Sequence, residues 1–214
     1  MPKLSLSQRE SLNSAVSRYH QSLEGSPAEE YLTQRGLSLS DVSKYRLGYV
    51  QDPLPEHTKY EGKLAIPYLR WHPRFGWGTV DIRFRALDDS KPKYQSMPGS
   101  RPRIYNTNAL MDGGLEVGVC EGEIDAITLS LAGMPTAGFP GATTLQPHWL
   151  SLFEGYTRVN VFTDGDEAGE KFAQSIAKSL PTARVIRFPD GEDANSIYQS
   201  GGAEQLRKFW STEE

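Results

Sequence analysis

The sequence has little cysteine and no long apolar run, and each shortage excludes a class of protein. Cys120 is the one cysteine in 214 residues, so this chain alone builds neither an internal disulfide nor a cysteine-clustered zinc site. No stretch reaches the roughly 18 apolar residues of a membrane span, and the opening MPKLSLSQRE lacks the apolar core of a signal peptide. We therefore expect a cytoplasmic protein without a membrane partner.

Net charge is also small, at −4 from 23 Lys and Arg against 27 Asp and Glu. A nucleic-acid role therefore cannot be inferred from overall charge and requires a local basic surface. The distribution along the chain supplies one, because residues 59–103 hold ten Lys or Arg against four Asp or Glu. The last hundred residues are richer in acids, so a basic middle precedes an acidic carboxyl-terminal half.

The first half combines helices with an antiparallel hairpin. Apolar spacing predicts a helix over residues 7–23, and Ser26-Pro27 begins a short second helix that ends at Gly36, with a third from Ser40. Period-two alternation predicts a hairpin over residues 63–87. Its outward residues are Asp81, Arg83 and Arg85, so this face is basic on balance. Residues 88–103 are rich in Pro, Ser and Lys and predict a surface loop.

The second half alternates strands with helices. Strands are predicted over 115–120, 135–139, 158–163 and 183–188, and helices over 123–131, 146–153, 167–180 and 194–199. This order indicates a parallel sheet with covering helices. We expect an α/β protein, with an α+β subdomain at residues 1–112 and a mostly parallel, helix-flanked domain at 113–214. Cys120 ends an apolar strand, which favours an inert residue over a reactive thiol.

Acidic residues follow three of the predicted strands directly. Glu121 follows the first strand, Asp164 and Asp166 follow the third, and Asp193 lies just after the fourth. Carboxyl ends of parallel strands share one edge, where ligands collect. Clustered carboxylates repel one another, and Mg²⁺ or Mn²⁺ would offset that repulsion. The alternative is that these acids only cap helices, which isolated acids often do.

The motifs themselves resemble a known family. EGEIDAITL at 121–129 and FTDGDEAG at 162–169 resemble the two TOPRIM motifs, and FPGATT at 139–144 and FPDGEDANSI at 188–197 resemble the segments that flank the second motif in DnaG-type bacterial and phage DNA primases. Five segments are similar, in order, to the basic subdomain before the primase TOPRIM fold: YLTQRGLS at 31–38, YRLGYV at 45–50, LAIPYL at 64–69, IRFRAL at 82–87 and PKYQS at 92–96. The resemblance spans roughly residues 28–200.

This resemblance implies roles for the acids. Glu121 would be the catalytic acid nearest the 3′-hydroxyl or its metal, and Asp164 and Asp166 would be catalytic residues that hold Mg²⁺ or Mn²⁺. Asp193 would be an auxiliary metal ligand. The family usually has a further aspartate where this chain has Asn195, which leaves one carboxylate fewer for a second metal position.

The resemblance also implies a groove for the template strand and nucleotide phosphates. Its basic residues are Arg35, Lys63, Arg83, Arg85 and Lys93. Lys and Arg neutralise phosphates, and Tyr94 offers a ring for stacking on a base or sugar. The alternative for each of these basic residues is that its side chain is only solvated at the surface and binds no ligand. Trp71, Trp77 and Tyr68 would likewise form a stacking platform or, as aromatics on a hairpin more often do, a core.

The implied function is metal-dependent synthesis of short RNA primers on single-stranded DNA from nucleoside triphosphates. We expect this reaction to take place in a bacterial cell, and the protein could be encoded by a phage. Complete bacterial primases also carry a zinc-binding and a helicase-binding domain, and we expect neither within this chain. A replicative helicase and a separate zinc-bearing module are therefore expected partners. The alternatives are a TOPRIM nuclease and a non-catalytic DNA-binding or nucleotide-binding accessory factor, whereas a topoisomerase would need a tyrosine domain that does not fit this length.

Overall fold

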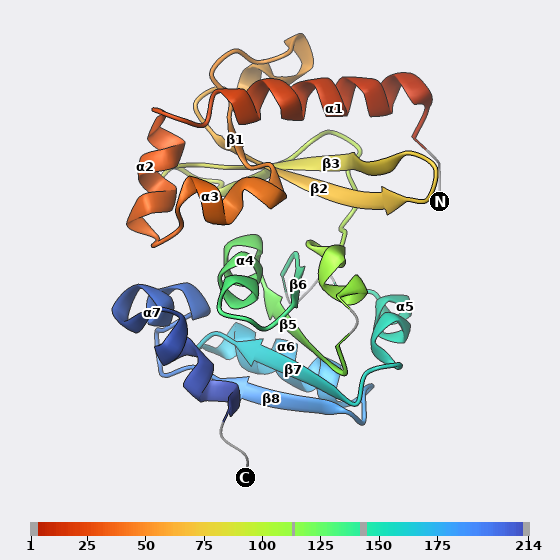
Figure 1. Ribbon diagram of the computed structural model, residues 1–214, viewed down its shortest axis with the longest axis vertical. Coiled ribbons are helices and arrows are strands. Elements are labelled where there is room, and N and C mark those ends of the chain that lie inside the picture. The colour runs from red at the N-terminus through yellow and green to blue at the C-terminus, as the bar shows by residue number, and fades with distance from the viewer. Residues whose placement is uncertain (1–3, 113, 142–144, 212–214) are drawn as a thin grey trace. The chain divides into compact units, whose positions relative to one another are not determined.

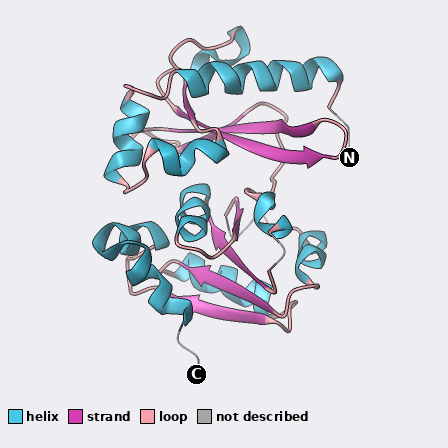
Figure 2. Cartoon of the chain, in the orientation of Figure 1, coloured by secondary structure: helices cyan, strands magenta, loops and turns pink. Residues whose placement is uncertain are grey.

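The computed structural model describes residues 4–112, 114–141 and 145–211 and divides into two compact units, residues 1–101 and 102–214 (Figures 1 and 2). Gly113, at the domain boundary expected from the sequence, and residues 142–144 of the FPGATT segment lie outside the described residues. A domain boundary at 112/113 stays a prediction. No helix in the described ranges has the length and apolar character needed to cross a bilayer.

The first unit is built on an antiparallel sheet in the order β1-β2-β3-β4. Its strands are β1 Gly48–Tyr49, β2 Leu64–His72, β3 Gly76–Arg85 and β4 Tyr94–Ser96. The predicted hairpin is therefore confirmed as β2 and β3. The expectation of a loop throughout 88–103 was wrong at β4, which pairs with the end of β3 through Arg85 and Tyr94. Three residues are too few for an alternation pattern to show in the sequence.

Helix α1, Leu6–Gln21, covers one face of this sheet (Figure 1). Its buried residues, Val16 and Tyr19 among them, join a core in which the Tyr60 and Phe84 rings stack at 3.9 Å. β1 passes so close to α1 that a methyl group at Gly48 would lie 2.4 Å from the Tyr19 backbone. The shorter helices are α2 Pro27–Gln34, α3 Leu39–Val42, and the 3-10 turns η1 Ser43–Tyr45 and η2 Pro55–Tyr60. Ser26 caps α2 as predicted.

The opposite face of β3 is also covered, which corrects the expected outward positions of two residues. Asp81 is 9% exposed and accepts a hydrogen bond from the Ser100 hydroxyl at 2.7 Å. Arg85 is 4% exposed and lies against Tyr31 of α2. Alternation assigned these residues to the second face correctly, but segments distant in sequence shield that face from solvent.

The hairpin aromatics divide between core and surface. Tyr68 is buried, as the sequence favoured, and Trp77 is half-buried. Trp71 is 46% exposed, so its assignment to the core was wrong. Trp71 lies near the hairpin end, beyond an irregularity in pairing between Tyr68 and Leu69, and it is not among the residues of the core cluster, which takes Ala65, Ile82 and Phe84 from this hairpin.

The second unit contains a parallel sheet in the order β6-β5-β7-β8, which confirms the α/β prediction. Its strands are β5 Glu116–Glu121, β6 Thr136–Phe139, β7 Arg158–Thr163 and β8 Ala183–Arg187. Its helical segments are η3 Thr107–Met111, α4 Glu123–Leu131, α5 Pro147–Leu150, η5 Ser151–Phe153, α6 Glu167–Ala177 and α7 Ala194–Ser211. α7 consists of two helical segments that meet at a kink at Gly202, whose φ of 66° and ψ of −166° are not helical. The helix predicted over 194–199 lies in the first segment, and the second segment was not predicted.

Helices cover both faces of this parallel sheet, as buried parallel strands require. Val159 and Val161 of β7 pack with Phe172 of α6 in one core cluster. On the other face, Phe162 meets Trp210 of α7 at a ring separation of 5.6 Å. With both faces apolar, the polar residues that follow the strands gather at the carboxyl edge of the sheet.

Candidate active site

Glu121 and Asp164 come from neighbouring strands at that edge. β5 and β7 pair in parallel with Val119 opposite Val161. Glu121 is the last residue of β5 and Asp164 directly follows β7. Since parallel strands in register end at the same edge, the two half-buried carboxylates lie at adjacent strand ends.

Asp166 and Asp193 each cap a helix. An Asp166 carboxylate oxygen accepts a hydrogen bond from the Gly169 backbone N–H at 2.8 Å, at the start of α6. Asp193 accepts from the Ser196 N–H at 2.7 Å, at the start of α7. Helix capping, the alternative reading of the acids, therefore holds for both residues. It does not exclude a ligand role, since each of these bonds uses one carboxylate oxygen.

The two turns that carry these acids are bonded to each other through their backbones. Gly165 donates to the Glu192 carbonyl at 3.1 Å, and Gly191 donates to the Gly165 carbonyl at 3.1 Å. Within the first turn, a methyl group at Gly169 would lie 2.5 Å from the Asp164 carbonyl oxygen. The glycines thus permit the close packing that brings the loop after β7 against the loop after β8.

Electrostatics link Asp164 to the other three predicted acids. Burial, followed by the charges of Asp193, Glu121 and Asp166 in that order, raises the pKa of Asp164 to about 7. Cys120 is buried, and burial followed by nearby acids raises its thiol pKa well above the ordinary value. A buried thiol that resists ionisation fits the inert residue expected from the sequence.

The donor set suits a hard divalent cation. All four acids offer carboxylate oxygen, which Mg²⁺ and Mn²⁺ prefer as a ligand. A bound cation would also offset the repulsion between the charges of the other three acids and the Asp164 carboxylate. Across residues 4–112, 114–141 and 145–211, no three Asp, Glu, His or Cys side chains form a ready-made metal shell. Water or substrate oxygens would therefore have to complete the coordination, as is usual for Mg²⁺.

Asn195 has a structural position. Its side chain is fully buried, donates to the Thr128 hydroxyl at 3.1 Å and accepts from the Gln199 side chain at 2.8 Å. Its backbone N–H also donates to Asp125 at 3.1 Å. Asn195 therefore joins the start of α7 to α4, and an amide, with both a donor and an acceptor, suits this place better than a carboxylate.

In the first unit, four predicted binding residues share a cation–π cluster with Tyr31. The Arg85 guanidinium lies 5.1 Å from the centre of the Tyr31 ring and 4.8 Å from that of Tyr94, to whose hydroxyl it also donates. Arg83 lies 4.4 Å from the Tyr94 ring, and Arg35 lies 5.1 Å from the Tyr31 ring. Tyr31 was missed from the sequence, although its spacing of four residues from Arg35 on a predicted helix was a usable signal.

The two predicted binding lysines stand outside this cation–π cluster. Lys93 is exposed immediately before Tyr94, and its carbonyl accepts from the Ala86 N–H at 2.9 Å. Lys63 is half-buried immediately before β2. The roles of all six residues in binding stay predictions.

Comparisons with known proteins agree with this geometry. The family described as Toprim-like matches residues 118–198, which include all four acids. Gene 57 protein of Mycobacterium phage D29 is 54% identical over 147 residues, covering 69% of this chain and 97% of that protein. DNA primase of Pseudomonas putida is 28% identical over 90% of this chain, which spans only 36% of that primase.

A solved DnaG primase catalytic domain has the same fold. It matches with a TM-score of 0.75 at 21% identity, covering 94% of this chain and 76% of that domain. Sequence similarity to primases, the TOPRIM match around the acids and this fold agree with one another. The chain belongs to one family with Gene 57 protein, and its Toprim-like domain and its fold are those of a DnaG-type primase core.

Proposed function

We propose that this chain synthesises short RNA primers on single-stranded DNA from nucleoside triphosphates. The observation that carries the proposal is the convergence of Glu121, Asp164, Asp166 and Asp193 on one sheet edge, seen in the effect of the other three on Asp164. Carboxylates that share such an edge suit a phosphate-binding divalent metal. Similarity to DNA primases along most of the chain supports a DNA template and nucleoside triphosphates as the substrates of that site.

Each acid has a distinct part in the proposed site. Asp164 and Asp166 would hold Mg²⁺ or Mn²⁺, with Asp193 as an auxiliary ligand. Glu121, at the end of β5, would lie nearest the 3′-hydroxyl and accept its hydrogen bond. A bound divalent ion would offset the negative charge that develops on the phosphates during phosphoryl transfer. The capping bonds of Asp166 and Asp193 would keep these side chains oriented.

The basic residues of the first unit would bind the template strand and the nucleotide phosphates. Lys93, Lys63, Arg35 and Arg83 are at least partly accessible and suit phosphate contacts. Arg85 is buried, so we assign it to positioning Tyr31 and Tyr94 rather than to direct contact. The DnaG catalytic domain that shares this fold was solved bound to single-stranded DNA, which supports DNA as the partner.

Further partners follow from the same family. A replicative helicase and a separate zinc-bearing module would act with this core, because complete bacterial primases carry domains for both functions. Similarity to a mycobacterial phage protein supports a phage-encoded enzyme that acts in the bacterial cytoplasm.

The test is primer synthesis on mixed-sequence single-stranded DNA with labelled nucleoside triphosphates and Mg²⁺ or Mn²⁺, comparing the wild-type chain with Glu121→Gln. We expect short RNA products from the wild type and their loss in the variant. Glu154→Gln, an exposed position in the same unit, removes a carboxylate elsewhere and should retain activity. Template cleavage in place of synthesis would favour the nuclease, and DNA binding without any reaction would favour an accessory factor.

A further inference from the structure

The end of the β2–β3 hairpin has a composition unlike the rest of the chain. Residues 70–78 read RWHPRFGWG, with three large aromatic residues, two arginines, a histidine and no acid. The protein as a whole carries a net charge of −4. The hairpin end is therefore a local basic and aromatic segment in an acidic protein, and the proposed primase site makes no use of it.

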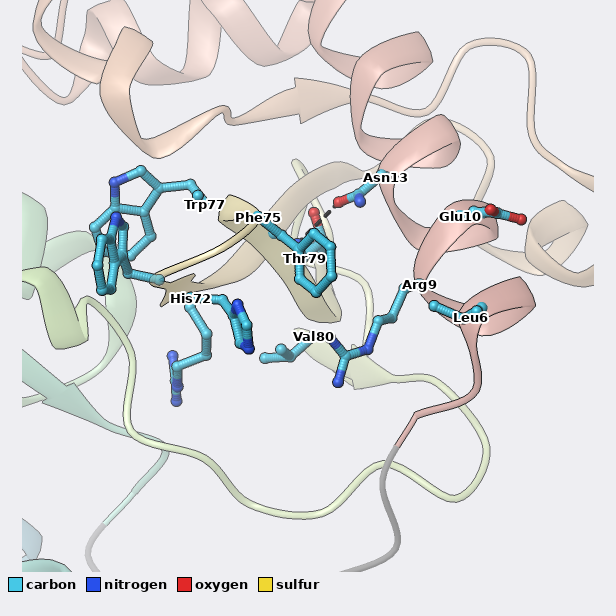
Figure 3. Close-up of a pocket in the computed structure, with 13 residues that line it drawn as sticks. Leu6, Arg9, Glu10, Asn13, His72, Phe75, Trp77, Thr79 and Val80 are labelled. Atoms are coloured by element: carbon cyan, nitrogen blue, oxygen red, sulfur yellow. Dashed lines mark hydrogen bonds between the residues drawn. The ribbon is translucent and has the colours of Figure 1, made fainter.

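A pocket of about 310 Å³ lies between this hairpin end and α1 (Figure 3). Trp71 and Trp77 are direct cross-strand partners at its border. The His72 and Phe75 rings stack with their centres 4.9 Å apart. The Thr79 N–H donates to the Asn13 side chain of α1 at 2.9 Å and so fixes the helix to the strand beneath the pocket (Figure 3).

The aromatic rings of this pocket are unusually accessible. Trp71 is 46% exposed and Phe75 is 66% exposed. Large rings left in water forgo the free energy of burial, and a group of them marks an interaction surface more often than an isolated ring does. A planar ligand can therefore reach both rings without unfolding the hairpin, although on Phe75 it would share the ring with His72 and Arg74.

Positive charge surrounds these rings. Arg9 of α1 and Arg70 of β2 line the pocket, and the Arg74 guanidinium lies 5.4 Å from the Phe75 ring centre. Glu10 is the one acid that lines the pocket. A ligand with flat rings and a negatively charged backbone matches both the accessible rings and the excess of arginines over acids among the lining residues.

We propose that this pocket binds single-stranded nucleic acid by stacking bases on Trp71 and Phe75 while Arg9 and Arg74 neutralise phosphates. It is distinct from the cluster around Tyr94, because the eight residue steps from Trp77 to Arg85 span about 26 Å of strand at about 3.3 Å per step. The pocket is thus a second contact for a strand, independent of catalysis and of the metal.

The test measures binding of the full chain to fluorescent oligothymidylate in EDTA, which removes any contribution from divalent metal. Trp71→Ala and Phe75→Ala should each weaken binding about fivefold or more, the usual effect of losing one stacking ring. Trp71→Phe keeps a ring and should retain most of the affinity. An abasic oligonucleotide of equal length should bind the wild type more weakly and should not distinguish wild type from Trp71→Ala.

Arg74→Ala should lower the dependence of log affinity on log salt by about one, whereas Lys178→Ala, an exposed lysine of the other unit, should leave it unchanged. Unaltered oligothymidylate affinity in both Trp71→Ala and Phe75→Ala would overturn the proposal. So would equal losses for oligothymidylate and abasic strands, since stacking would then not be the interaction. Glu154→Gln should bind as the wild type does. Because binding is measured in EDTA and without nucleoside triphosphates, failure of this inference is distinguishable from failure of the primase assignment, which primer synthesis tests.

Discussion

Gly165 and Pro189 lie against each other so closely that a methyl group on Gly165 would be 2.0 Å from the Pro189 carbonyl oxygen. The contact joins the turn of Asp164 and Asp166 to the turn that precedes Asp193. No side chain fits between them, and backbone hydrogen bonds on both sides of Gly165 hold the turns together. The relative placement of the acids therefore depends on a residue that carries no charge.

Gly165→Ala should separate the two turns. We expect a loss of at least about 1 kcal/mol in the free energy of unfolding, because an overpacked backbone contact must shift. Metal-dependent activity should fall more than tenfold, since the acids would move relative to one another. Urea unfolding and primer synthesis measure the two effects. Gly155→Ala, where a methyl group meets nothing within 4 Å, is the matched control, and equal behaviour of the two variants would contradict the structural role of Gly165.

Asp164→Asn should stabilise the metal-free protein at neutral and higher pH. The folded pKa of Asp164 is about 7, against 3.8 for the ordinary group. Between these values the folded state holds a proton that the unfolded state has released, so stability falls as pH rises from about 4 to 7. The variant lacks that loss. At about 1.4 kcal/mol per pKa unit the full shift corresponds to about 4.5 kcal/mol, and because Asp164 is only half-buried, solvent screening lowers the expected gain to about 3 kcal/mol near pH 8 in EDTA.

Urea unfolding across this pH range measures the effect, with Asp190→Asn as the control for removal of an exposed carboxylate from the neighbouring turn. The same Asp164 variant should lose metal-dependent activity. A sharply lowered unfolding midpoint would instead identify Asp164 as a structural residue.

Asn195→Asp should not improve metal binding, although it restores the aspartate usual in the family. The substitution removes the donor to the Thr128 hydroxyl, which itself donates to the Ile124 carbonyl, and places a charge at a fully buried position. We expect a loss of about 2 kcal/mol or more in unfolding free energy. Thermal unfolding and Mg²⁺ titration measure this, and tighter Mg²⁺ binding at unchanged stability would show that position 195 faces the metal.

Lys93→Ala should weaken binding of single-stranded DNA or nucleotide and reduce its salt dependence by about one phosphate contact. Lys93 is exposed, so its loss should leave stability unchanged. Binding isotherms at several salt concentrations measure the slope, with Lys178→Ala as the control of equal charge. An unaltered slope would remove Lys93 from the binding surface.

Much of the second unit could be predicted because its signals are local. Helix α4 has the predicted bounds, and parallel order followed from the alternation of strands and helices. That order predicted that Glu121 and Asp164 would meet at one edge, since strands that run in parallel end together. Whether these acids bind metal stays a prediction.

The features that sequence did not reveal depend on distant segments. Alternation along β3 separates two faces, but it does not show that Tyr31 and Ser100 shield the second one. The second helical segment of α7, which follows the non-helical Gly202, was not predicted because the apolar pattern considered in the sequence stopped at the paired glycines. Asn195 differed from the family pattern in sequence, and only its contacts with Thr128 and Gln199 give the physical reason.

The capping bonds of Asp166 and Asp193 have an entropic consequence. A side chain that becomes fixed when a ligand arrives loses rotational freedom worth about 0.5–1.5 kcal/mol. Here the amino termini of α6 and α7 already restrict two of the four carboxylates before any ligand is present. Folding of these helices therefore preorganises two of the four carboxylates, and it does so through backbone N–H groups, so the effect does not depend on the side chains at positions 169 and 196.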